Sequence, residues 1–193
     1  MKKFELTNEF VTNMFGTKLF RIRALVEFGD VEAGELGGYV EKESNLGHDD
    51  NAWVYGDAQV FGDALVYGNA RVYDNAWVCG NAWVYGNARV CGDAWVCGDA
   101  LVCGNARVCS DEDYAYAHGF GSVNRTTTFF RLKDGGVGVR CGCFYGTLAQ
   151  FRDKIRETHG ETKKAQEYLM LADLMELRFE EDENEVGNRK YVE

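Results

Sequence analysis

Between Asn51 and Ser110 the hydrophobic and polar positions repeat every six residues, through ten consecutive hexads. The first position of each hexad is Asn or Asp, the second is Ala, the fourth is Val, and the sixth is Gly except at Asp74 and Ser110. Because six is an even period, Ala and Val share one face of a pleated strand, and the third and fifth positions share the other. Gly followed by Asn or Asp is typical of a bend. Each hexad therefore predicts a short strand and a corner, and the hexads must stack, since so small a unit cannot bury its Val alone.

The third position of the hexads indicates how many of them make one turn. Arg71, Arg89 and Arg107 recur at every third hexad, and Trp77 and Trp95 have the same spacing. We therefore expect three-sided coils, each made of three hexads. Residues three hexads apart would then lie about 4.8 Å from each other, at the strand spacing.

The pattern Ala-x-Val-x-Gly-Asn/Asp resembles the hexapeptide repeat of left-handed β-helix proteins over residues 51–110. This resemblance implies a three-sided, left-handed parallel β-helix of a kind that commonly trimerises. Degenerate turns at Asn45–Asp50 and Asp111–Tyr116 extend the repeat at its two ends. The flanks, which contain LFRIRALVEFGDVEAGELGGYV and TTTFFRLKDGGVGVRCGCF, resemble hypothetical proteins of bacteriophages and of prophages in gut-type bacteria, a group with no established activity.

The expected fold class is mainly β, a solenoid with a flanking segment on each side. The N-terminal flank reads as short strands and turns that cap the first coil. The C-terminal flank predicts a ββαα segment: a hairpin around KDGG, a helix that begins at Thr147, and a second helix over roughly 161–178. The expected boundaries are 1–44 for the N-terminal β cap, 45–116 for the β-helix, 117–179 for the C-terminal segment, and 180–193 for a charged, flexible tail.

Two of the three outer faces of the expected coils are apolar and aromatic, which is rare on a monomer. One interpretation is an interface between copies, or cover by the flanking segments. The other is a platform of aromatic side chains bordered by arginines, which suits a planar anionic ligand such as a nucleotide. The two interpretations are compatible if ligands bind at the junctions between subunits. The candidate oligomer interface is the third face, with Leu65, Tyr67, Trp83, Tyr85, Leu101 and Cys103.

Further candidate ligand contacts come from the loop HGFGSVNRTTT and from the arginine column, our name for Arg71, Arg89 and Arg107, which stack in the expected coils. Stacked arginines repel each other unless carboxylates or anions intervene, so acidic partners from a flank and an anion site are both open. The glycines, hydroxyls and arginine of the loop suit a phosphate, although such loops are commonly plain turns. The candidate ligand-binding residues are Arg71, Arg89, Arg107, Trp77, Trp95, His118, Ser122, Asn124, Arg125 and Thr126.

Net charge and hydropathy reduce the number of partner classes and of cellular compartments that we expect for this protein. A formal net charge of -10 counts against duplex nucleic acid. No apolar run approaches the ~20 residues of a membrane span, so we expect no membrane contact. The opening MKKFELTNEF lacks the apolar stretch of a signal peptide, which favours the cytoplasm.

The cysteines predict packing rather than redox or metal chemistry. Five of the seven occupy the fifth position of hexads, where Tyr and Phe also occur. Neighbours in register, such as Cys91 and Cys109, are close but fit disulfide geometry poorly. Cys141 and Cys143 have no partners for a four-ligand zinc site. We therefore expect no metal and no cofactor.

These features predict a non-enzymatic, oligomeric binding protein of phage type, with a trimer favoured. It would capture or block a host component in counter-defence, either a host protein or a small anionic ligand such as a nucleotide signal. One alternative is a hexapeptide-repeat acyltransferase that uses acyl-CoA. The resemblance implies a histidine base for that reaction, but no hexad contains one, and His118 is the candidate. The other alternative is a structural solenoid of the virion.

Overall fold

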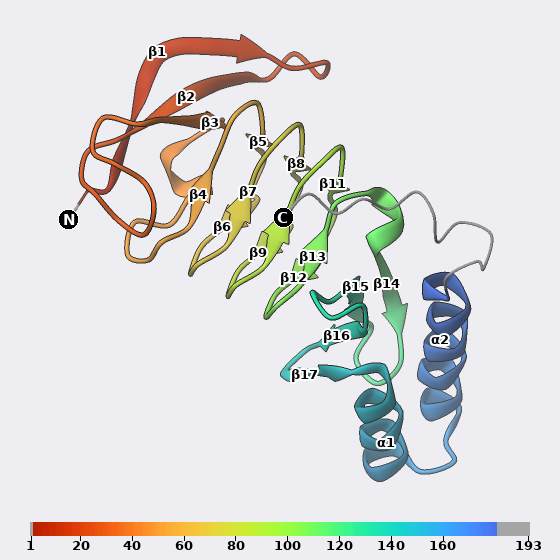
Figure 1. The fold of residues 1–193 in the computed structure, drawn as a ribbon. Helices are drawn as coiled ribbons and strands as arrows, with labels where there is room; N and C mark the ends of the chain where they lie inside the picture. Colours follow the sequence, from red (N-terminus) through yellow and green to blue (C-terminus); the bar gives the residue numbers. More distant parts are fainter. Residues whose placement is uncertain (1, 181–193) are drawn as a thin grey trace.

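The computed structural model describes residues 2–180, and within them the chain forms a β-solenoid between an N-terminal hairpin and a C-terminal α+β module (Figure 1). The expected tail, apart from Glu180, lies outside the described residues. The helices of residues 2–180 include none long and apolar enough to cross a membrane.

The solenoid has three faces, each a parallel sheet of two-residue strands. Arg71 pairs with Arg89 and Arg89 with Arg107, while Trp77 pairs with Trp95, so the predicted three-sided coils of three hexads are confirmed. The first face has the order β13-β10-β7-β4, the second ends in β5-β8-β11, and the third has the order β12-β9-β6. The strands are β4 (Trp53–Val54), β5 (Gln59–Val60), β6 (Leu65–Val66), β7 (Arg71–Val72), β8 (Trp77–Val78), β9 (Trp83–Val84), β10 (Arg89–Val90), β11 (Trp95–Val96), β12 (Leu101–Val102) and β13 (Arg107–Val108).

The core of the solenoid consists of the Ala and Val side chains that the period of six points inward. Every Val at the fourth position is fully buried, from Val54 to Val108, and the Ala residues are at most 1% exposed. Burial of a Val side chain contributes roughly 1.5–3 kcal/mol. Stacked coils therefore supply the stability that no single hexad has.

The corners combine left-handed backbone with side-chain ladders. Glycines such as Gly86 adopt positive φ, and Asp74 takes the same conformation at 60° where a hexad lacks glycine. At one corner the amide of Asn69 donates to Asn87 at 3.2 Å, and Asn87 donates to Asn105 at 3.4 Å. The first position is thus Asn or Asp because its side chain bonds to the next coil.

The N-terminal segment continues the second face and covers it. Strand β2 (Lys18–Ala24) pairs in antiparallel orientation with both β1 (Phe4–Thr12) and β3 (Leu36–Val40), and β3 pairs in parallel with β5. The hairpin of β1 and β2 extends along the solenoid toward β8 and β11 (Figure 1). A short 3-10 helix, η1 (Glu43–Asn45), precedes Leu46, whose bridge to Val66 adds a further strand position to the third face.

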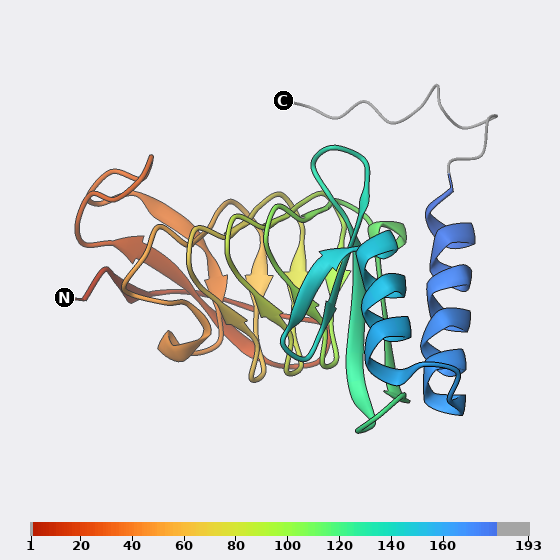
Figure 2. The same ribbon diagram turned by 90° about the horizontal axis from the view of Figure 1, so that it is seen from below.

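The C-terminal module places an antiparallel sheet between the last coil and two helices (Figure 2). The hairpin around KDGG is confirmed, since β15 pairs with β16, and Thr147 caps the first helix as predicted. The second predicted helix is also present. The elements are η2 (Asp111–Asp113), β14 (Tyr114–Phe120), β15 (Arg125–Arg131), β16 (Val137–Cys141), β17 (Phe144–Thr147), α1 (Leu148–His159) and α2 (Lys163–Phe179).

Candidate functional site

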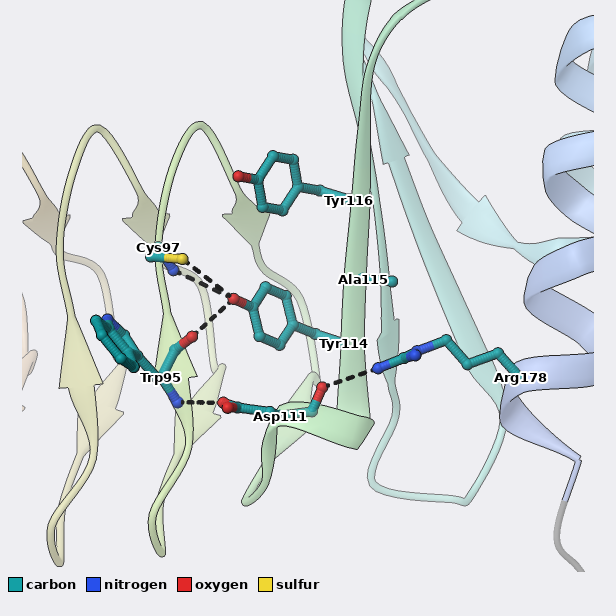
Figure 3. Close-up of a pocket in the computed structure, with 7 residues that line it drawn as sticks. All are labelled: Trp95, Cys97, Asp111, Tyr114, Ala115, Tyr116 and Arg178. Atoms are coloured by element: carbon teal, nitrogen blue, oxygen red, sulfur yellow. Dashed lines mark hydrogen bonds between the residues drawn. The ribbon is translucent and has the colours of Figure 1, made fainter.

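A groove of about 400 Å³ lies where the second face of the solenoid meets the C-terminal module (Figure 3). Its floor comes from β11, one wall from η2 and the start of β14, and its rim from the end of α2. Three aromatic rings, one thiol and one guanidinium converge on it. The lining residues are Trp95, Cys97, Asp111, Tyr114, Ala115, Tyr116 and Arg178.

The floor of the groove follows from the alternation of the hexad. Trp95 and Cys97 occupy the third and fifth positions, so both side chains point outward while Val96 is buried. The indole Nε1 of Trp95 donates to Cys79 Sγ at 3.0 Å. Burial raises the pKa of the Cys79 thiol, which keeps it protonated beneath the indole.

The wall of the groove also caps the open end of the second face. In earlier coils the backbone N–H at the third position donates to the next coil, but β11 is the last strand of this face within residues 2–180. Asp111 Oδ1 accepts from the Trp95 backbone at 2.7 Å, and the Tyr114 hydroxyl donates to Trp95 O at 2.7 Å and accepts from Cys97 N at 3.3 Å. Burial raises the pKa of the Tyr114 phenol. Side chains therefore satisfy the backbone groups that a further coil would otherwise pair.

The rim of the groove carries its charge. Arg178 is exposed, and its guanidinium donates to the backbone oxygen of Asp111 at 3.1 Å. Tyr116, on the opposite side, is 40% exposed. Beyond the groove, Phe15 at the tip of the β1–β2 hairpin has its ring 5.8 Å from that of Trp95. The hairpin tip thus extends the aromatic surface.

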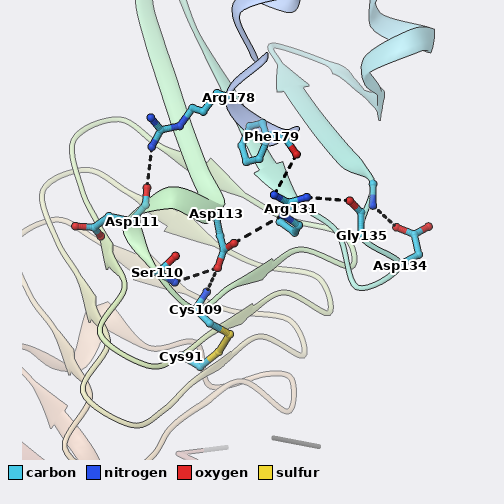
Figure 4. Close-up of polar contacts among 11 residues, drawn as sticks. Cys91, Cys109, Ser110, Asp111, Asp113, Arg131, Asp134, Gly135, Arg178 and Phe179 are labelled. Atoms are coloured by element: carbon cyan, nitrogen blue, oxygen red, sulfur yellow. Dashed lines mark hydrogen bonds and ion pairs between the residues drawn. A yellow bond between two sulfur atoms is a disulfide. The ribbon is translucent and has the colours of Figure 1, made fainter. Parts of the chain in front are cut away.

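A buried ion pair fixes the module that supplies the wall and rim (Figure 4). Asp113 accepts from the backbone of Cys109 and Ser110 at 2.9 and 3.0 Å, and lies 3.8 Å from Arg131. Arg131 donates in turn to the backbone oxygen of Phe179 at 3.2 Å. The end of the solenoid and the end of α2 are thereby connected through two buried side chains.

The cysteine prediction needs one correction. Cys91 and Cys109 are joined by a disulfide, with their Cα atoms 4.3 Å apart. We expected such neighbours to remain thiols, but stacked coils bring fifth positions into lateral contact. The other five cysteines are free. No cluster of three or more potential metal ligands occurs in the described part of the chain.

The arginine column exists, but its members have different surroundings. Arg71 makes two hydrogen bonds to the carboxylate of Asp30, at 2.7 and 2.8 Å, so the acidic partner from a flank is real at this coil. Arg89 is exposed, and its side chain makes no ion pair within residues 2–180. Arg107 is half-buried near the end of the solenoid. Trp53, at the start of the column, is fully buried beneath Phe4 and Phe28.

The aromatic column of the second face is present and partly covered. The rings of Trp77 and Trp95 are 5.5 Å apart, and Phe15 packs against both. The flanking segments therefore account for part of the apolar surface, as one of the two interpretations predicted. Of the predicted ligand residues, Trp95 alone lines the groove.

The third face, the candidate oligomer interface, is open in part. Trp83 is 43% exposed, and the rings of Tyr67 and Tyr85 stack at 5.0 Å. Cys103 is only 3% exposed, which corrects its place in the predicted interface, because the C-terminal sheet packs over the last coil. The backbone of Leu101 there donates to Thr128 Oγ1 at 2.9 Å.

The predicted loop residues lie at the other end of β14 from the groove. His118 Nδ1 is 2.9 Å from Thr126 Oγ1, and Arg125 packs against Gly142. Two backbone donors of the loop are already engaged: Gly121 N donates to Glu167, and Ser122 N donates to Tyr168. Asn124 adopts a left-handed turn conformation with φ 51°. The structure does not bring this loop together with the arginine or tryptophan columns.

Sequence reasoning missed most of the groove. A signal for two of its residues was present, since Asp111 and Tyr114 stand three hexads after Asp93 and Val96 and so continue the register of the coils. Arg178 had no such signal, because only the folding of the C-terminal module places α2 beside the last coil.

Comparison with known proteins agrees with this architecture. No curated protein matches the chain. Two stretches of the solenoid, residues 64–80 and 82–98, match the family model of the YdcK beta solenoid repeat. The repeat in the sequence, the stacked parallel coils and this similarity together show that the chain is a β-solenoid repeat protein.

Proposed function

We propose that this protein is a non-enzymatic, oligomeric binding protein whose groove takes a planar, anionic ligand of nucleotide type. The observation that supports this proposal is that Trp95, Tyr114 and Tyr116 line one groove together with the exposed guanidinium of Arg178. Aromatic faces stack on a planar ring, and a guanidinium binds phosphate through two parallel hydrogen bonds. The volume of about 400 Å³ is within the range of small-molecule sites.

The carboxylate of Asp111 adds a selectivity element at the same rim. Its Oδ1 is held by the backbone of Trp95. Oδ2 makes no hydrogen bond within residues 2–180, so it is available to accept from an amino group on the ligand ring. A ligand with both a phosphate and an exocyclic amine fits this pair of charges better than a simple anion.

The biological role that we propose is capture or blockade of a host component, such as a nucleotide signal or a defence protein, in the cytoplasm. The flanks support this by their resemblance to phage and prophage proteins, which is an association and not a geometry. A homotrimer assembled through the third face, where Trp83 is exposed beside Leu65, is part of the same proposal.

Isothermal titration calorimetry against a panel of nucleotides, including cyclic dinucleotides, tests the binding function. We expect Arg178→Ala to weaken binding by about tenfold or more, because it removes a charge-assisted contact. Trp95→Phe should weaken it less. Arg156→Ala is the matched control, since Arg156 is an exposed arginine of α1 whose one ion pair within residues 2–180 is with Asp153.

The variant Arg89→Ala tests whether the ligand binds in the groove or at the arginine column. If the groove is the site, Arg89→Ala binds as the wild type does. No binding of any panel member, or equal loss in Arg156→Ala and Arg178→Ala, would reject the proposal.

Two assays address the other classes of function. An acyltransferase would turn over acyl-CoA and lose that turnover in His118→Ala; we expect no turnover, because His118 lies at the far end of β14 from the coils. A virion component would be found in purified particles, and we expect the protein in the soluble fraction of infected cells instead.

A further inference from the structure

A second cavity, of about 540 Å³, lies where the last coil of the solenoid meets the turn between β15 and β16. We call it the corner pocket, and its lining residues are Asn105, Leu132, Lys133, Asp134 and Tyr145. It shares none of them with the groove, whose lining comes from the second face, η2, β14 and α2. A volume of this size is within the range of small-molecule sites.

Backbone contacts hold the β15–β16 turn against the last coil. The N–H of Lys133 donates to the backbone oxygen of Asn105 at 3.1 Å. The preceding residue, Leu132, forms an antiparallel bridge with Ala106. Two successive residues of the turn are therefore fixed beside two successive residues of the coil, so the side chains of Lys133 and Asn105 belong to one site.

Tyr145 forms another wall of the corner pocket, and its position is fixed at both ends of the side chain. Its ring stacks on that of the fully buried Phe130, with the ring centroids 6.5 Å apart. Its hydroxyl lies against Gly104, the residue before Asn105. The hydroxyl makes no hydrogen bond within residues 2–180, and the side chain is 45% exposed. The phenol therefore presents a hydroxyl beside the corner.

Asn105 is the last member of a ladder of asparagine amides along this corner. Asn51 Nδ2 donates to Asn69 Oδ1 at 3.1 Å, and Asn69 Nδ2 donates to Asn87 Oδ1 at 3.2 Å. Asn87 Nδ2 donates in turn to Asn105 Oδ1 at 3.4 Å. Each Nδ2 thus faces the next coil, and Asn105 is the last residue of this corner within residues 2–180. Its Nδ2 is therefore left as a donor at the corner pocket.

The other two corners present acceptors where this one presents a donor. Asn75 Nδ2 donates to Asp93 at 3.0 Å, and Asn81 Nδ2 donates to Asp99 at 2.9 Å. A carboxylate only accepts, so chemistry fixes the direction of these rungs, and it is the direction of the asparagine ladder. Amides bonded in series polarise one another, which strengthens the terminal donor of Asn105.

The turn adds one charge of each sign to this donor. Lys133 is exposed, and its ammonium makes no ion pair or hydrogen bond in the described part of the chain. Asp134 Oδ1 accepts from the backbone of Gly136 at 3.1 Å (Figure 4). Its other oxygen has no partner among residues 2–180. The corner pocket therefore combines three donors, one carboxylate acceptor and the apolar side chain of Leu132.

We propose that the corner pocket binds a small zwitterion of the amino-acid class. The ligand carboxylate accepts from Asn105 Nδ2, Lys133 Nζ and the Tyr145 hydroxyl, which its two oxygens can accommodate. The ligand ammonium donates to Asp134, and an apolar ligand side chain contacts Leu132. A nucleotide with several phosphates is disfavoured, because the carboxylate of Asp134 offsets the charge of Lys133 in the same pocket.

Ligand-observed NMR titration of the full chain with leucine, methionine and phenylalanine tests the site. We expect Asn105→Asp to weaken binding by about tenfold or more, because it replaces a donor with a carboxylate that repels the ligand carboxylate. The fold tolerates a carboxylate at this position of a hexad, as Asp93 and Asp99 show. Gln166→Glu is the matched control, since it makes the same change of charge at an exposed position of α2.

Two further variants remove single donors without adding a negative charge. Tyr145→Phe keeps the stacked ring and loses only the hydroxyl, and we expect it to weaken binding several-fold. Lys133→Ala should weaken binding by a similar factor. Lys163→Ala is its control, since Lys163 is an exposed lysine at the start of α2. Arg178→Ala, in the groove, should bind the amino acids as the wild type does.

Blocked ligands test whether both charges of the zwitterion are read. N-acetylleucine and leucinamide each lack one charge and should bind about tenfold more weakly than leucine. Asp134→Asn should bring the affinity for leucine down to that for N-acetylleucine and leave the latter unchanged. Any one of three results would overturn the assignment: no binding of the three amino acids at millimolar concentration, equal effects of Asn105→Asp and Gln166→Glu, or blocked ligands that bind as leucine does.

Discussion

Lys3 is a buried cation that closes the first coil of the solenoid. Its ammonium donates to the backbone oxygens of Asp50 and Ala52, both at 2.8 Å, and lies over the ring of Phe28. These oxygens precede Trp53 on the first face, where no earlier strand pairs with β4. Burial lowers the pKa of Lys3 to about 8, against the raising effect of Asp50 and Asp49.

Replacement of Lys3 should destabilise the folded protein, whereas replacement of its neighbour Lys2 should not. We expect Lys3→Met to lower the free energy of unfolding by about 1–3 kcal/mol, because two buried carbonyl oxygens lose their donor. Lys2→Met is the control, since Lys2 is half-exposed and its one ion pair in the described part of the chain is with Glu43. Urea unfolding measures both; similar losses in the two variants would contradict the capping role.

The lowered pKa of Lys3 also predicts a pH dependence with a defined sign. Between about pH 8 and pH 10.5 the unfolded chain holds a proton on Lys3 that the folded chain has lost. The unfolded state therefore binds more protons, and this group makes the free energy of unfolding rise with pH in that window. The rise should be absent in Lys3→Met when unfolding is measured at pH 7.5, 9 and 10.

The five free cysteines should react at very different rates. Burial raises the pKa of the Cys79 and Cys103 thiols, so the native protein holds little of either as the reactive thiolate. Cys143 is exposed. With iodoacetamide at pH 8, mass spectrometry should find Cys143 labelled first and Cys79 and Cys103 last. Early labelling of Cys103 would show that the C-terminal sheet does not cover the last coil.

At the scale of elements, the corner glycines are needed for two separable reasons. Gly86 has φ 71°, a conformation that side chains resist, and a Cβ there would lie 3.0 Å from the backbone nitrogen of Gly104 on the next coil. Gly135, in the β15–β16 turn, has φ 86° but no heavy atom within 4 Å of its Cβ position. A side chain at either site would strain the backbone, but only at Gly86 would it also press against the next coil.

Gly86→Ala should therefore destabilise the protein more than Gly135→Ala. The strain common to both costs on the order of 1 kcal/mol, and Gly86→Ala adds the displacement of a stacked coil. Thermal unfolding of the two variants measures the difference. A midpoint that falls equally in both would mean that the coils separate freely at their corners.

The solenoid elements could be predicted from the sequence because their determinants are local and repeated. The period of six fixed the strand positions, and the recurrence of arginine fixed the three-sided turn. The hairpin that covers the second face was not predictable in the same way. Phe15 contacts Trp77 and Trp95, which lie far along the chain, and no periodicity connects them. The disulfide between Cys91 and Cys109 likewise depends on how closely adjacent coils approach.

At the scale of the whole molecule, the groove exists only because three distant segments meet. Trp95 was a candidate from its column, but Arg178 and Tyr116 belong to a helix and a strand whose docking on the solenoid depends on tertiary packing. The buried pair of Asp113 and Arg131 lies where the module meets the end of the solenoid. Sequence reasoning therefore found the scaffold and one floor residue, and placed the other ligand candidates on surfaces that the fold keeps apart.

Two hydrophobic cores meet at strand β15, where neighbouring residues point to opposite sides. Phe130 belongs to the core of the solenoid, and Phe129 belongs to the core under α1 and α2, where its ring lies 6.0 Å from Phe151. Both phenylalanines are fully buried. This alternation makes β15 the element through which the solenoid and the C-terminal module share stability.

Phe129→Ala and Phe130→Ala make the same substitution at neighbouring buried positions, but we expect each to destabilise a different part of the molecule. Each removes a buried ring, at about 3–5 kcal/mol. Hydrogen exchange should show Phe129→Ala losing protection in α1 and α2 while the coils up to β11 remain protected. Phe130→Ala should lose protection at the last coil, and it should also weaken ligand binding in the groove, because the wall at Tyr114 is packed in the same core. If both variants lose protection throughout residues 2–180 to the same extent, the molecule unfolds as one unit, and the division at β15 is wrong.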